Sequence, residues 1–278
     1  MDLPEEPNIG TSKEVAIDIK VDPPTSKVIM ITGATSGIGK ATAELFAENG
    51  YDLILTGRRF SRLFKLKEEL ETKHTGKVQL LPFDVTSSAA VTAAVNELDD
   101  AWKNVDILIN NAGLALGFEP IHEGNLEDWD TMIDTNIKGL LYMTRAIAPY
   151  MVKNKKGHII NISSIAGKEV YPNGGVYCAT KHAVEALTKA MRIDLHKHNI
   201  RVSQIAPGHV EETEFAKVRF HGDEERAKIY EDFVPVNSRD IADSIYFLAT
   251  RPAHVNIQDI FIMGTQQASA TITDRSGR

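Results

Sequence analysis

The sequence predicts an α/β fold in which a parallel sheet of seven strands is covered by helices on both faces. Seven short, almost continuous apolar runs occur along the chain, and such runs are typical of strands that are buried on both faces. Helical patterns separate the runs, and this alternation indicates parallel strands joined by right-handed crossovers. No break in composition interrupts the alternation, so we expect a single domain over residues 27–270.

The seven expected strands are KVIMIT (27–32), DLILT (52–56), VQLLPFD (78–84), VDILIN (105–110), HIINIS (158–163), RVSQIAP (201–207) and DIFIM (259–263). Expected helices include KATAELFAENG (40–50) and FSRLFKLKEELETK (60–73). A third helix, 175–198, carries side chains at the three-four spacing of a packed face, namely Val176, Thr180, Ala183, Leu187, Met191 and Leu195. Residues 1–26 are rich in Pro and Glu without a sustained period, and we expect a flexible arm there and a C-terminal tail over 271–278.

One stretch does not fit the alternation of strands and helices, namely TEFAKVRFHGDEERAKIYEDF (213–233). It follows the sixth expected strand, and open α/β sheets bind ligands at the carboxyl ends of their strands. This position favours a mobile helical segment that covers a site. A plain surface helix is the alternative interpretation.

Composition and charge disfavour several classes of protein. The formal net charge of the 278 residues is −7, whereas a protein that binds the nucleic-acid backbone normally shows a basic surface. The apolar runs are too short to cross a membrane, and the first residues lack the features of a targeting segment. Among the nine histidines no pair has the spacing of a convincing zinc site, so we expect no metal.

The single cysteine, Cys178, rules out an intrachain disulfide and fits a reducing compartment. No base stands near it in sequence, so a small packed side chain explains it better than a reactive thiol. We therefore expect a cytoplasmic protein without nucleic-acid or membrane partners.

A glycine-rich turn follows the first expected strand, in TGATSGIGKATAELF (32–46). Gly33, Gly37 and Gly39 allow the backbone to turn sharply and to approach a pyrophosphate closely. The helix that opens after them offers free N–H groups and a favourable dipole to phosphates. The position after the first strand favours a dinucleotide site over a plain strand-to-helix turn.

The second strand leads into an arginine pair, in LILTGRR (53–59). A site that prefers NAD usually has an acidic residue here, which holds the ribose 2′-hydroxyl. Gly57, Arg58 and Arg59 occupy the region instead, and an arginine can bind a 2′-phosphate through charge-assisted hydrogen bonds. The pair therefore favours NADP(H), with two solvated loop arginines as the alternative.

Two further strand ends carry candidate cofactor contacts. Asp84 can accept a hydrogen bond from an adenine amino group, or it can be a plain strand-end carboxylate. NNAG (110–113) ends the fourth strand, where Gly113 permits close approach of a cofactor and the asparagines can fix the turn.

Tyr177 and Lys181 lie four residues apart in YCATK, a spacing that places both side chains on one face of a helix. A free tyrosine is a poor base at neutral pH, but a nearby ammonium favours the phenolate and lowers the phenol pKa. Such a phenol can take a proton from an alcohol or give one to a carbonyl oxygen. Ser164 lies upstream at a strand end and can orient the reacting oxygen, with Ser163 as the alternative. An exposed helix pair without chemistry is the other interpretation of YCATK.

These motifs together resemble the short-chain dehydrogenase/reductase family over about residues 27–265. TGATSGIG is similar to the family's cofactor turn, and NNAG is similar to its fourth-strand motif. Asn136 in DTNIKG, followed by Ser164, Tyr177 and Lys181, resembles the complete catalytic tetrad. The motifs occur in the order and spacing of the family, which makes the resemblance highly specific.

The resemblance implies a doubly wound Rossmann fold and an oxidoreductase that moves a hydride between the nicotinamide of NADP(H) and an alcohol or carbonyl carbon. It implies that Tyr177 acts as acid and base and that Ser164 orients the substrate. It further implies that Lys181 holds the nicotinamide ribose and that Asn136 supports a water relay to Lys181.

For the cofactor, the resemblance implies that Arg58 meets the 2′-phosphate and that Asp84 meets the adenine. The chain departs from the family at APGHVEETEF (206–215), where one extra residue precedes the threonine, so the contact of Thr213 with the nicotinamide carboxamide is open. The residues expected to bind NADP(H) are Gly33, Thr35, Ser36, Gly37, Ile38, Gly39, Arg58, Arg59, Asp84, Val85, Asn111, Ala112, Gly113, Tyr177, Lys181, Pro207, Gly208, Val210 and Thr213. The resemblance also implies a homotetramer, assembled through helices at 127–153 and 175–198.

Within the family, SSIAGKEVYPNGGVYCATKHAV, ETEFAKVRFHGDEERAKIYED and QQAS resemble NADP-dependent 3-hydroxy acid dehydrogenases, which oxidise serine and compounds like 3-hydroxypropionate. This resemblance implies a small-molecule substrate that is a hydroxy acid. We expect Ser164 and Tyr177 to contact its reacting oxygen. Arg219 is a candidate for its carboxylate, because the planar guanidinium matches a carboxylate in two hydrogen bonds. A local ion pair of Arg219 with the glutamates of EETE (211–214) is the alternative.

Two other functions remain open at the level of the sequence. A reductase of larger carbonyl substrates, such as 3-oxoacyl thioesters, sugars or steroids, would use the same motifs, and the basic residues of 213–233 suit an acidic carrier protein. The second is a non-catalytic NADP(H)-binding protein on the same fold, but such a protein would be expected to lack Tyr177 or Lys181.

Overall fold

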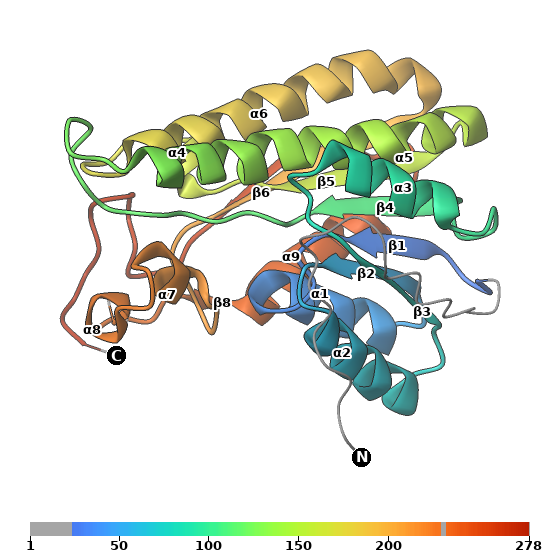
Figure 1. Cartoon of the computed structure of the whole chain (residues 1–278), viewed down its shortest axis with the longest axis horizontal. Helices are drawn as coiled ribbons and strands as arrows, with labels where there is room; N and C mark the ends of the chain where they lie inside the picture. The colour runs from blue at the N-terminus through green and yellow to red at the C-terminus, as the bar shows by residue number, and fades with distance from the viewer. Residues whose placement is uncertain (1–23, 229–231, 278) are drawn as a thin grey trace.

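The computed structural model describes residues 24–228 and 232–277. Its centre is a seven-stranded parallel sheet with the order β3-β2-β1-β4-β5-β6-β9, and helices cover both faces (Figure 1). The strands of this sheet are β1 (Val28–Ile31), β2 (Asp52–Gly57), β3 (Val78–Pro82), β4 (Val105–Asn110), β5 (Gly157–Ile162), β6 (Ile200–Pro207) and β9 (Asp259–Ile262). The α-helices are α1 (Gly37–Glu48), α2 (Phe60–Lys73), α3 (Ser88–Glu97), α4 (Leu126–Ile133), α5 (Leu140–Asn154), α6 (Gly175–Leu195), α7 (Phe215–Arg219), α8 (Glu224–Ala227) and α9 (Ser238–Thr250).

The fold expected from the sequence is confirmed, and the seven strands begin and end within two residues of their predicted bounds. The strand order reverses between β1 and β4, because the chain runs outward from β1 to β3 and then returns to place β4 beside β1. Such a switch point opens a crevice at the carboxyl ends of the two strands. The glycine turn after β1 and the NNAG segment after β4 therefore meet at this crevice.

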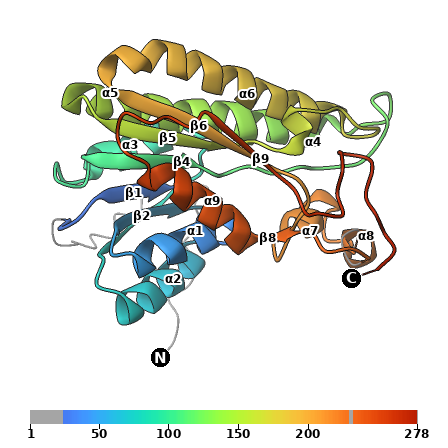
Figure 2. The ribbon, with the colours of Figure 1, turned by 180° about the vertical axis from the view of Figure 1, so that it is seen from behind.

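Two hydrophobic cores lie on opposite faces of the sheet, because successive side chains of a strand point to opposite faces. Ile29 and Ile31 of β1 belong to the core beneath α1, α2 and α9. Val28 and Met30 of the same strand belong to the core beneath α3, α5 and α6. Figures 1 and 2 show these two helical layers on either side of the sheet. Burial on both faces explains the nearly continuous apolar runs of the strands.

A buried carboxylate fixes the amino ends of three strands. Asp52 is fully buried, and its side chain accepts hydrogen bonds from the backbone N–H groups of Thr25 (2.6 Å), Ser26 (2.7 Å) and Lys77 (2.7 Å). These bonds give hydrogen-bond partners to carboxyl oxygens that would otherwise be buried without any. Of the expected N-terminal arm, residues 1–23 lie outside the described residues, while Thr25 and Ser26 are tied to the sheet.

Helix α6 is the expected helix 175–198, and its last turn is a short 3₁₀ helix, η3 (His196–His198). The side chains that were predicted to form the packed face of this helix are buried or half-buried. The face that points most directly inward, however, runs through Tyr177, Lys181, Val184 and Thr188. Cys178 is also buried, as the packed-side-chain interpretation expected. The polar side chains on this inward face point to a site beneath the helix.

Residues 213–228, which we call the lid, contain the short helices α7 and α8 and lie at the carboxyl end of the sheet beside β8 (Figure 1). A two-residue ladder, β7 (Val210–Glu211) with β8 (Val236–Asn237), anchors the chain on either side of the lid. The backbone N–H of Gly117 donates to the carbonyl of Arg219 (3.0 Å) and fastens the lid to the segment after β4. No helix in the described part of the chain is both long and apolar enough to cross a membrane.

Candidate active site

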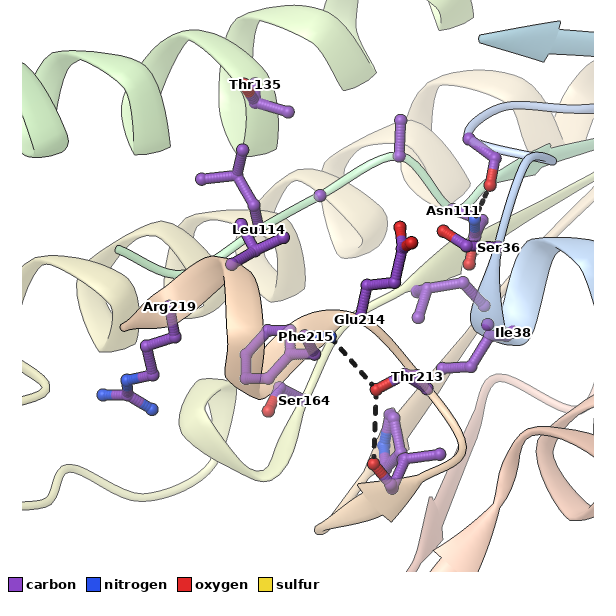
Figure 3. Close-up of a pocket in the computed structure, with 18 of the residues that line it drawn as sticks. Ser36, Ile38, Asn111, Leu114, Thr135, Ser164, Thr213, Glu214, Phe215 and Arg219 are labelled. Carbon is purple, nitrogen blue, oxygen red and sulfur yellow. Dashed lines mark hydrogen bonds between the residues drawn. The ribbon is translucent and has the colours of Figure 1, made fainter. Parts of the chain in front are cut away.

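A cavity of about 540 Å³ opens at the carboxyl ends of the strands, between the glycine turn, α6 and the lid (Figure 3). Its wall runs from Arg58 and Asp84 at one end to Ser164 and Tyr177 at the other, so one continuous space joins the predicted cofactor and catalytic residues. The predicted site residues that line it are Gly33, Thr35, Ser36, Gly37, Ile38, Arg58, Arg59, Asp84, Val85, Asn111, Ala112, Gly113, Ser164, Tyr177, Lys181, Pro207, Gly208, Val210, Thr213 and Arg219. Gly39 and Asn136 were also predicted, and they lie behind this wall.

The glycines of the first turn are required by its backbone. Gly33 (φ 66°) and Gly37 (φ 51°) adopt the left-handed conformation, which other residues rarely take. At Gly39 a Cβ atom would lie 2.4 Å from the carbonyl oxygen of Gly33, so only glycine lets α1 start this close to the turn. The free N–H groups at the start of the 12-residue helix α1 thus face the cavity, as an anion-binding turn requires.

The NNAG segment holds that turn in place. The Asn111 side chain donates to the carbonyl oxygens of Thr32 (2.8 Å) and Gly33 (3.2 Å). The Thr32 hydroxyl accepts in return from the backbone N–H groups of Asn111 (3.0 Å) and Ala112 (2.9 Å). The role expected for the asparagines in fixing the turn therefore falls to Asn111.

The two arginines after β2 differ in position. The Arg58 side chain is 66% exposed and lies 3.6 Å from Asp84 at the outer end of the cavity. Arg59 turns inward, and its guanidinium donates to the hydroxyls of Thr35 (2.7 Å) and Ser36 (3.1 Å) in the glycine turn. A cation and two hydroxyls are thereby gathered beside the start of α1, and the carboxyl end of β2 carries no acidic residue.

Asp84 forms a local turn at the strand end and also lines the cavity. One carboxylate oxygen accepts from the backbone N–H and the hydroxyl of Thr86 (both 2.9 Å), which is a local turn at the strand end. The other oxygen is the one nearest Arg58, and the residue lines the cavity. The helix that follows is capped by Ser87 rather than by Asp84.

Tyr177 and Lys181 are both buried on the inward face of α6, and the Lys181 ammonium lies 5.9 Å from the centre of the Tyr177 ring. The ammonium donates to the carbonyl oxygen of Ile162 (2.9 Å) at the end of β5. Burial lowers the pKa of Lys181 to about 8 from its ordinary value of 10.5. The lysine therefore still carries a positive charge beside the phenol at neutral pH.

Ser164 and Ser163 both lie at the carboxyl end of β5 and both line the cavity. The Ser164 hydroxyl caps the following short 3₁₀ helix η2 (Ile165–Gly167) by accepting from the N–H of Ala166 (3.1 Å). That acceptor bond leaves the hydroxyl hydrogen of Ser164 free to point elsewhere. Ser163 is more deeply buried, at 2% exposure against 8%, and its oxygen lies against Gly167.

Asn136 lies in a π-helical turn, η1 (Asp134–Gly139), between α4 and α5. Its side chain accepts from the N–H of Leu114 (2.8 Å) and donates to the carbonyl of Leu114 (2.8 Å) and to the hydroxyl of Thr180 (3.0 Å). It thus ties the segment after NNAG to α6. A Cβ atom at Gly113 would lie 3.1 Å from the Asn136 oxygen and 3.4 Å from the Lys181 ammonium, so glycine keeps these two groups close.

The extra residue before Thr213 is absorbed by the backbone. Glu212 adopts the left-handed conformation (φ 58°), which is unusual for a residue other than glycine. This turn returns Thr213 to the cavity wall, where its methyl group would lie 3.1 Å from a Cβ atom at Gly37. Thr213 therefore covers the glycine turn despite the departure from the family's spacing.

Arg219, at the end of α7, is 6% exposed and lines the cavity close to Tyr177. Three aromatic rings surround its guanidinium. The Cζ atom of Arg219 lies 4.7 Å from the ring centre of Phe118, 5.5 Å from that of Tyr171 and 5.7 Å from that of Tyr177. It donates to the Tyr171 hydroxyl (3.1 Å) and to the carbonyl of Gly117 (3.3 Å). Within the described residues its Nη2 atom has no hydrogen-bond partner although it is buried. The local ion pair with a neighbouring glutamate, which was the alternative for Arg219, does not occur among the described residues.

Several residues of the site were not predicted individually. Phe118 and Tyr171 both pack against the Arg219 guanidinium, His209 follows Gly208 in the wall, and Arg275 reaches the wall from the C-terminal tail. Burial lowers the pKa of His209 to about 4, with smaller contributions from Arg275 and Arg219, so its imidazole is neutral at pH 7. No group of three or more His, Cys, Asp or Glu side chains in the described part of the chain is arranged to hold a metal ion.

Comparison with known proteins agrees with this geometry. Residues 27–224 match the model of the short chain dehydrogenase family. The NADP-dependent 3-hydroxy acid dehydrogenase YdfG of Salmonella typhimurium is 47% identical over 247 residues, which cover 88% of this chain and 98% of that protein. Sulfoacetaldehyde reductase 2 of Chromohalobacter salexigens is 44% identical over 253 residues, covering 90% and 99% of the two chains.

A solved structure gives the same result at the level of the fold. The closed form of serine dehydrogenase complexed with NADP+ superimposes with a TM-score of 0.84 at 44% identity, over 89% of this chain and 98% of that one. The resemblance drawn from the sequence motifs is confirmed. The chain belongs to the short-chain dehydrogenase family.

Proposed function

We propose that this chain is an NADP(H)-dependent oxidoreductase of small hydroxy acids and the corresponding carbonyl compounds. The observation that carries the substrate class is the buried guanidinium of Arg219, which has an unpartnered Nη2 atom in a wall that it shares with Ser164 and Tyr177. A buried cation with an unused donor favours an anionic ligand group, because such a group supplies both charge and hydrogen bonds. The relatives named for 3-hydroxy acids and for sulfoacetaldehyde act on small anionic compounds, which supports the same class.

The residues of the cavity fit NADP(H). The crowded glycine turn and the start of α1 suit a pyrophosphate, and Arg59 with Thr35 and Ser36 suits a 2′-phosphate. Arg58 and Asp84 flank the outer end, where an adenine would be held. The serine dehydrogenase structure with NADP+ supports this choice of cofactor. When bound, the nicotinamide accepts or supplies the hydride.

Residues of this chain carry out the proton transfer. In the oxidation of an alcohol, the Tyr177 phenolate takes the hydroxyl proton, and the buried Lys181 ammonium stabilises that phenolate. Ser164 donates a hydrogen bond to the reacting oxygen and orients it. In the reduction of a carbonyl, the same phenol gives its proton to the oxygen. Asn136 acts indirectly, by holding the segment after β4 against α6.

The experiment that tests the substrate class replaces Arg219 with methionine, which keeps an unbranched apolar stem and removes the charged guanidinium. The oxidation of 3-hydroxypropionate is compared with that of 1,3-propanediol, a neutral molecule of the same length. Lost charge-assisted bonds should raise KM for the acid roughly 10- to 100-fold while leaving KM for the diol nearly unchanged.

The matched control is Lys217→Met, which removes a lid cation whose side chain is exposed and paired with Glu224. This variant should behave like the unmodified enzyme with both substrates. Equal losses for the acid and the diol in Arg219→Met would show that the arginine packs the lid rather than binding the anion. Faster turnover of a 3-oxoacyl thioester than of small hydroxy acids would favour the larger-substrate alternative.

We also propose a cytoplasmic homotetramer. Several large apolar side chains are exposed on the two helical surfaces that were expected to form the interfaces, namely Leu126, Ile133 and Leu141 on the α4–α5 face and Ile193 on α6. Exposed apolar groups on a helical face are typical of an interaction surface. Sedimentation velocity on the purified chain measures the state, and a monomer at micromolar concentration would contradict the proposal.

A further inference from the structure

Glu214 bridges the lid to the opposite wall of the cavity. One of its carboxylate oxygens accepts from Arg59 (2.7 Å) and the other accepts from Arg62 (2.6 Å). Glu214 is 155 positions from Arg59 and 152 positions from Arg62 in sequence, so the bridge joins the start of the lid to the start of α2. Figure 3 shows the Glu214 side chain extending from the lid into the cavity, between Phe215 and Ser36.

The guanidinium of Arg59 is shared between the lid and the glycine turn. Its Nη1 donates to Glu214, while its Nη2 donates to the hydroxyls of Thr35 (2.7 Å) and Ser36 (3.1 Å). A planar guanidinium has five N–H donors in a fixed arrangement, so it can bind two anionic groups on different edges at once. The group that we assign to the 2′-phosphate is therefore also the group that holds the lid.

The other end of the same short helix carries the proposed substrate contact. Glu214 immediately precedes α7 and Arg219 ends it, and the N–H of Val218 donates to the carbonyl of Glu214 (2.9 Å). Arg219 is in turn fastened to Gly117 through its backbone carbonyl (3.0 Å) and its Nε atom (3.3 Å). Glu214 and Arg219 are thus joined by one hydrogen-bonded turn of helix, through which a constraint on one residue can reach the other.

The bridge persists across the pH range in which such an enzyme is assayed. Burial opposes the ionisation of Glu214, but the hydrogen bonds from Arg62 and Arg59 outweigh it and hold the pKa of the carboxyl at about 2. Protonation therefore does not open the bridge near neutral pH. A ligand that changes the position of Arg59 is the means by which the bridge can respond.

We propose that Glu214 is a positioning residue that couples the 2′-phosphate of NADP(H) to the closure of the lid over the substrate. The inference rests on the proposed function, since it takes Arg59 as the phosphate contact and Arg219 as the substrate contact. A 2′-phosphate fixes Arg59, and Arg59 then holds the lid through Glu214. NAD(H) offers only a 2′-hydroxyl, which gives Arg59 no charge to bind, and it leaves the lid less constrained.

Hydrogen exchange of the lid amides tests the coupling without relying on turnover. Exchange over residues 214–228 is measured for the unliganded enzyme, with saturating NADP+ and with saturating NAD+. The unmodified enzyme should show at least about fivefold greater protection with NADP+ than with NAD+, the lower end of typical coupling between two sites. In Glu214→Gln the two cofactors should protect the lid equally.

Kinetics give an independent measurement on the same variants. Glu214→Gln should raise KM for 3-hydroxypropionate at least about fivefold with NADP+ and much less with NAD+, while kcat changes little. Glu214→Asp keeps the charge and should restore part of the difference. The matched control is Glu212→Gln, which removes a carboxylate two residues away that makes no ion pair in the described part of the chain.

Two results would overturn the coupling. NADP+ could accelerate exchange of the lid, which would mean that the phosphate takes Arg59 away from Glu214. Alternatively, Glu214→Gln could retain the NADP+-specific protection, which would make the bridge an incidental surface contact. Fluorescence titration with NADPH and NADH separates this failure from failure of the proposed function, because equal affinities in the unmodified enzyme would remove the 2′-phosphate site itself.

Discussion

Replacing Lys181 with methionine removes a buried charge while keeping an unbranched side chain in the same space. In the folded chain, burial lowers the pKa of this lysine from 10.5 to about 8, because the residue is only 6% exposed. A difference of about 2.5 pKa units between unfolded and folded chains corresponds to a destabilisation of about 3 kcal/mol when the lysine is charged in both states. The fold therefore places this ammonium where it lowers the stability of the chain.

The sign of the pH dependence follows from this difference. Below pH 8 the lysine is protonated in both states, and the unfavourable burial of its charge is fully present. Between pH 8 and 10.5 the unfolded chain holds a proton that the folded chain has released, so the free energy of unfolding of the unmodified enzyme rises relative to that of Lys181→Met. The free energy of unfolding of the unmodified enzyme, minus that of the variant, should thus increase by about 3 kcal/mol over this window.

Urea denaturation of both proteins without cofactor, at several pH values between 7 and 10.5, measures the difference. Other titrating groups are common to the two proteins and cancel in the comparison. The hydrogen bond from Lys181 to Ile162 is lost at every pH and adds only a constant offset. A stability difference that does not change with pH would show that Lys181 is not desolvated in the folded enzyme.

Three more substitutions test separate parts of the site. Tyr177→Phe should lower turnover by at least about 100-fold and leave NADPH binding, followed by fluorescence, nearly unchanged; substantial turnover would assign the proton transfer to another group. Arg59→Ala should weaken NADPH binding roughly 10- to 100-fold with little effect on NADH, whereas an effect confined to Arg58→Ala would place the 2′-phosphate at the outer arginine. Glu212→Gly should raise the free energy of unfolding by about 1 kcal/mol, because glycine adopts the left-handed backbone without strain; a lower melting temperature would mean that the Glu212 side chain is itself stabilising.

The parts of the site that were predictable from the sequence are those in which the chemistry is local. The glycine turn and the YCATK pair each lie within one strand–helix connection or one helix, so spacing alone determines how their side chains are placed. The expected strands located the carboxyl ends at which these motifs meet. The family resemblance then supplied Asn136, whose partners Leu114 and Thr180 lie on two other elements and give no local signal.

Contacts between distant segments could not be predicted. Nothing in the sequence links Glu214 to Arg59 and Arg62, or places Phe118 and Tyr171 against Arg219. These contacts depend on how the lid lies across the crevice, and that arrangement depends on tertiary packing rather than on local pattern.

Two details of the site needed the placed side chains. The resemblance implies that Arg58 meets the 2′-phosphate, and this stays a prediction; the structure adds that Arg59 is the arginine that donates to the glycine turn. The extra residue before Thr213 made its position open in the sequence. The left-handed backbone at Glu212 absorbs that residue, and no propensity favours such a conformation for glutamate.

The most direct test of the account is a comparison of kcat/KM for 3-hydroxypropionate and 1,3-propanediol with NADP+ and with NAD+ in the unmodified enzyme. If Arg59 binds the 2′-phosphate and Arg219 binds the carboxylate, kcat/KM should be highest for 3-hydroxypropionate with NADP+. Changing either the cofactor or the charge of the substrate should then lower kcat/KM by at least about tenfold. Equal use of the two cofactors, or a diol oxidised as efficiently as the acid, would contradict the account.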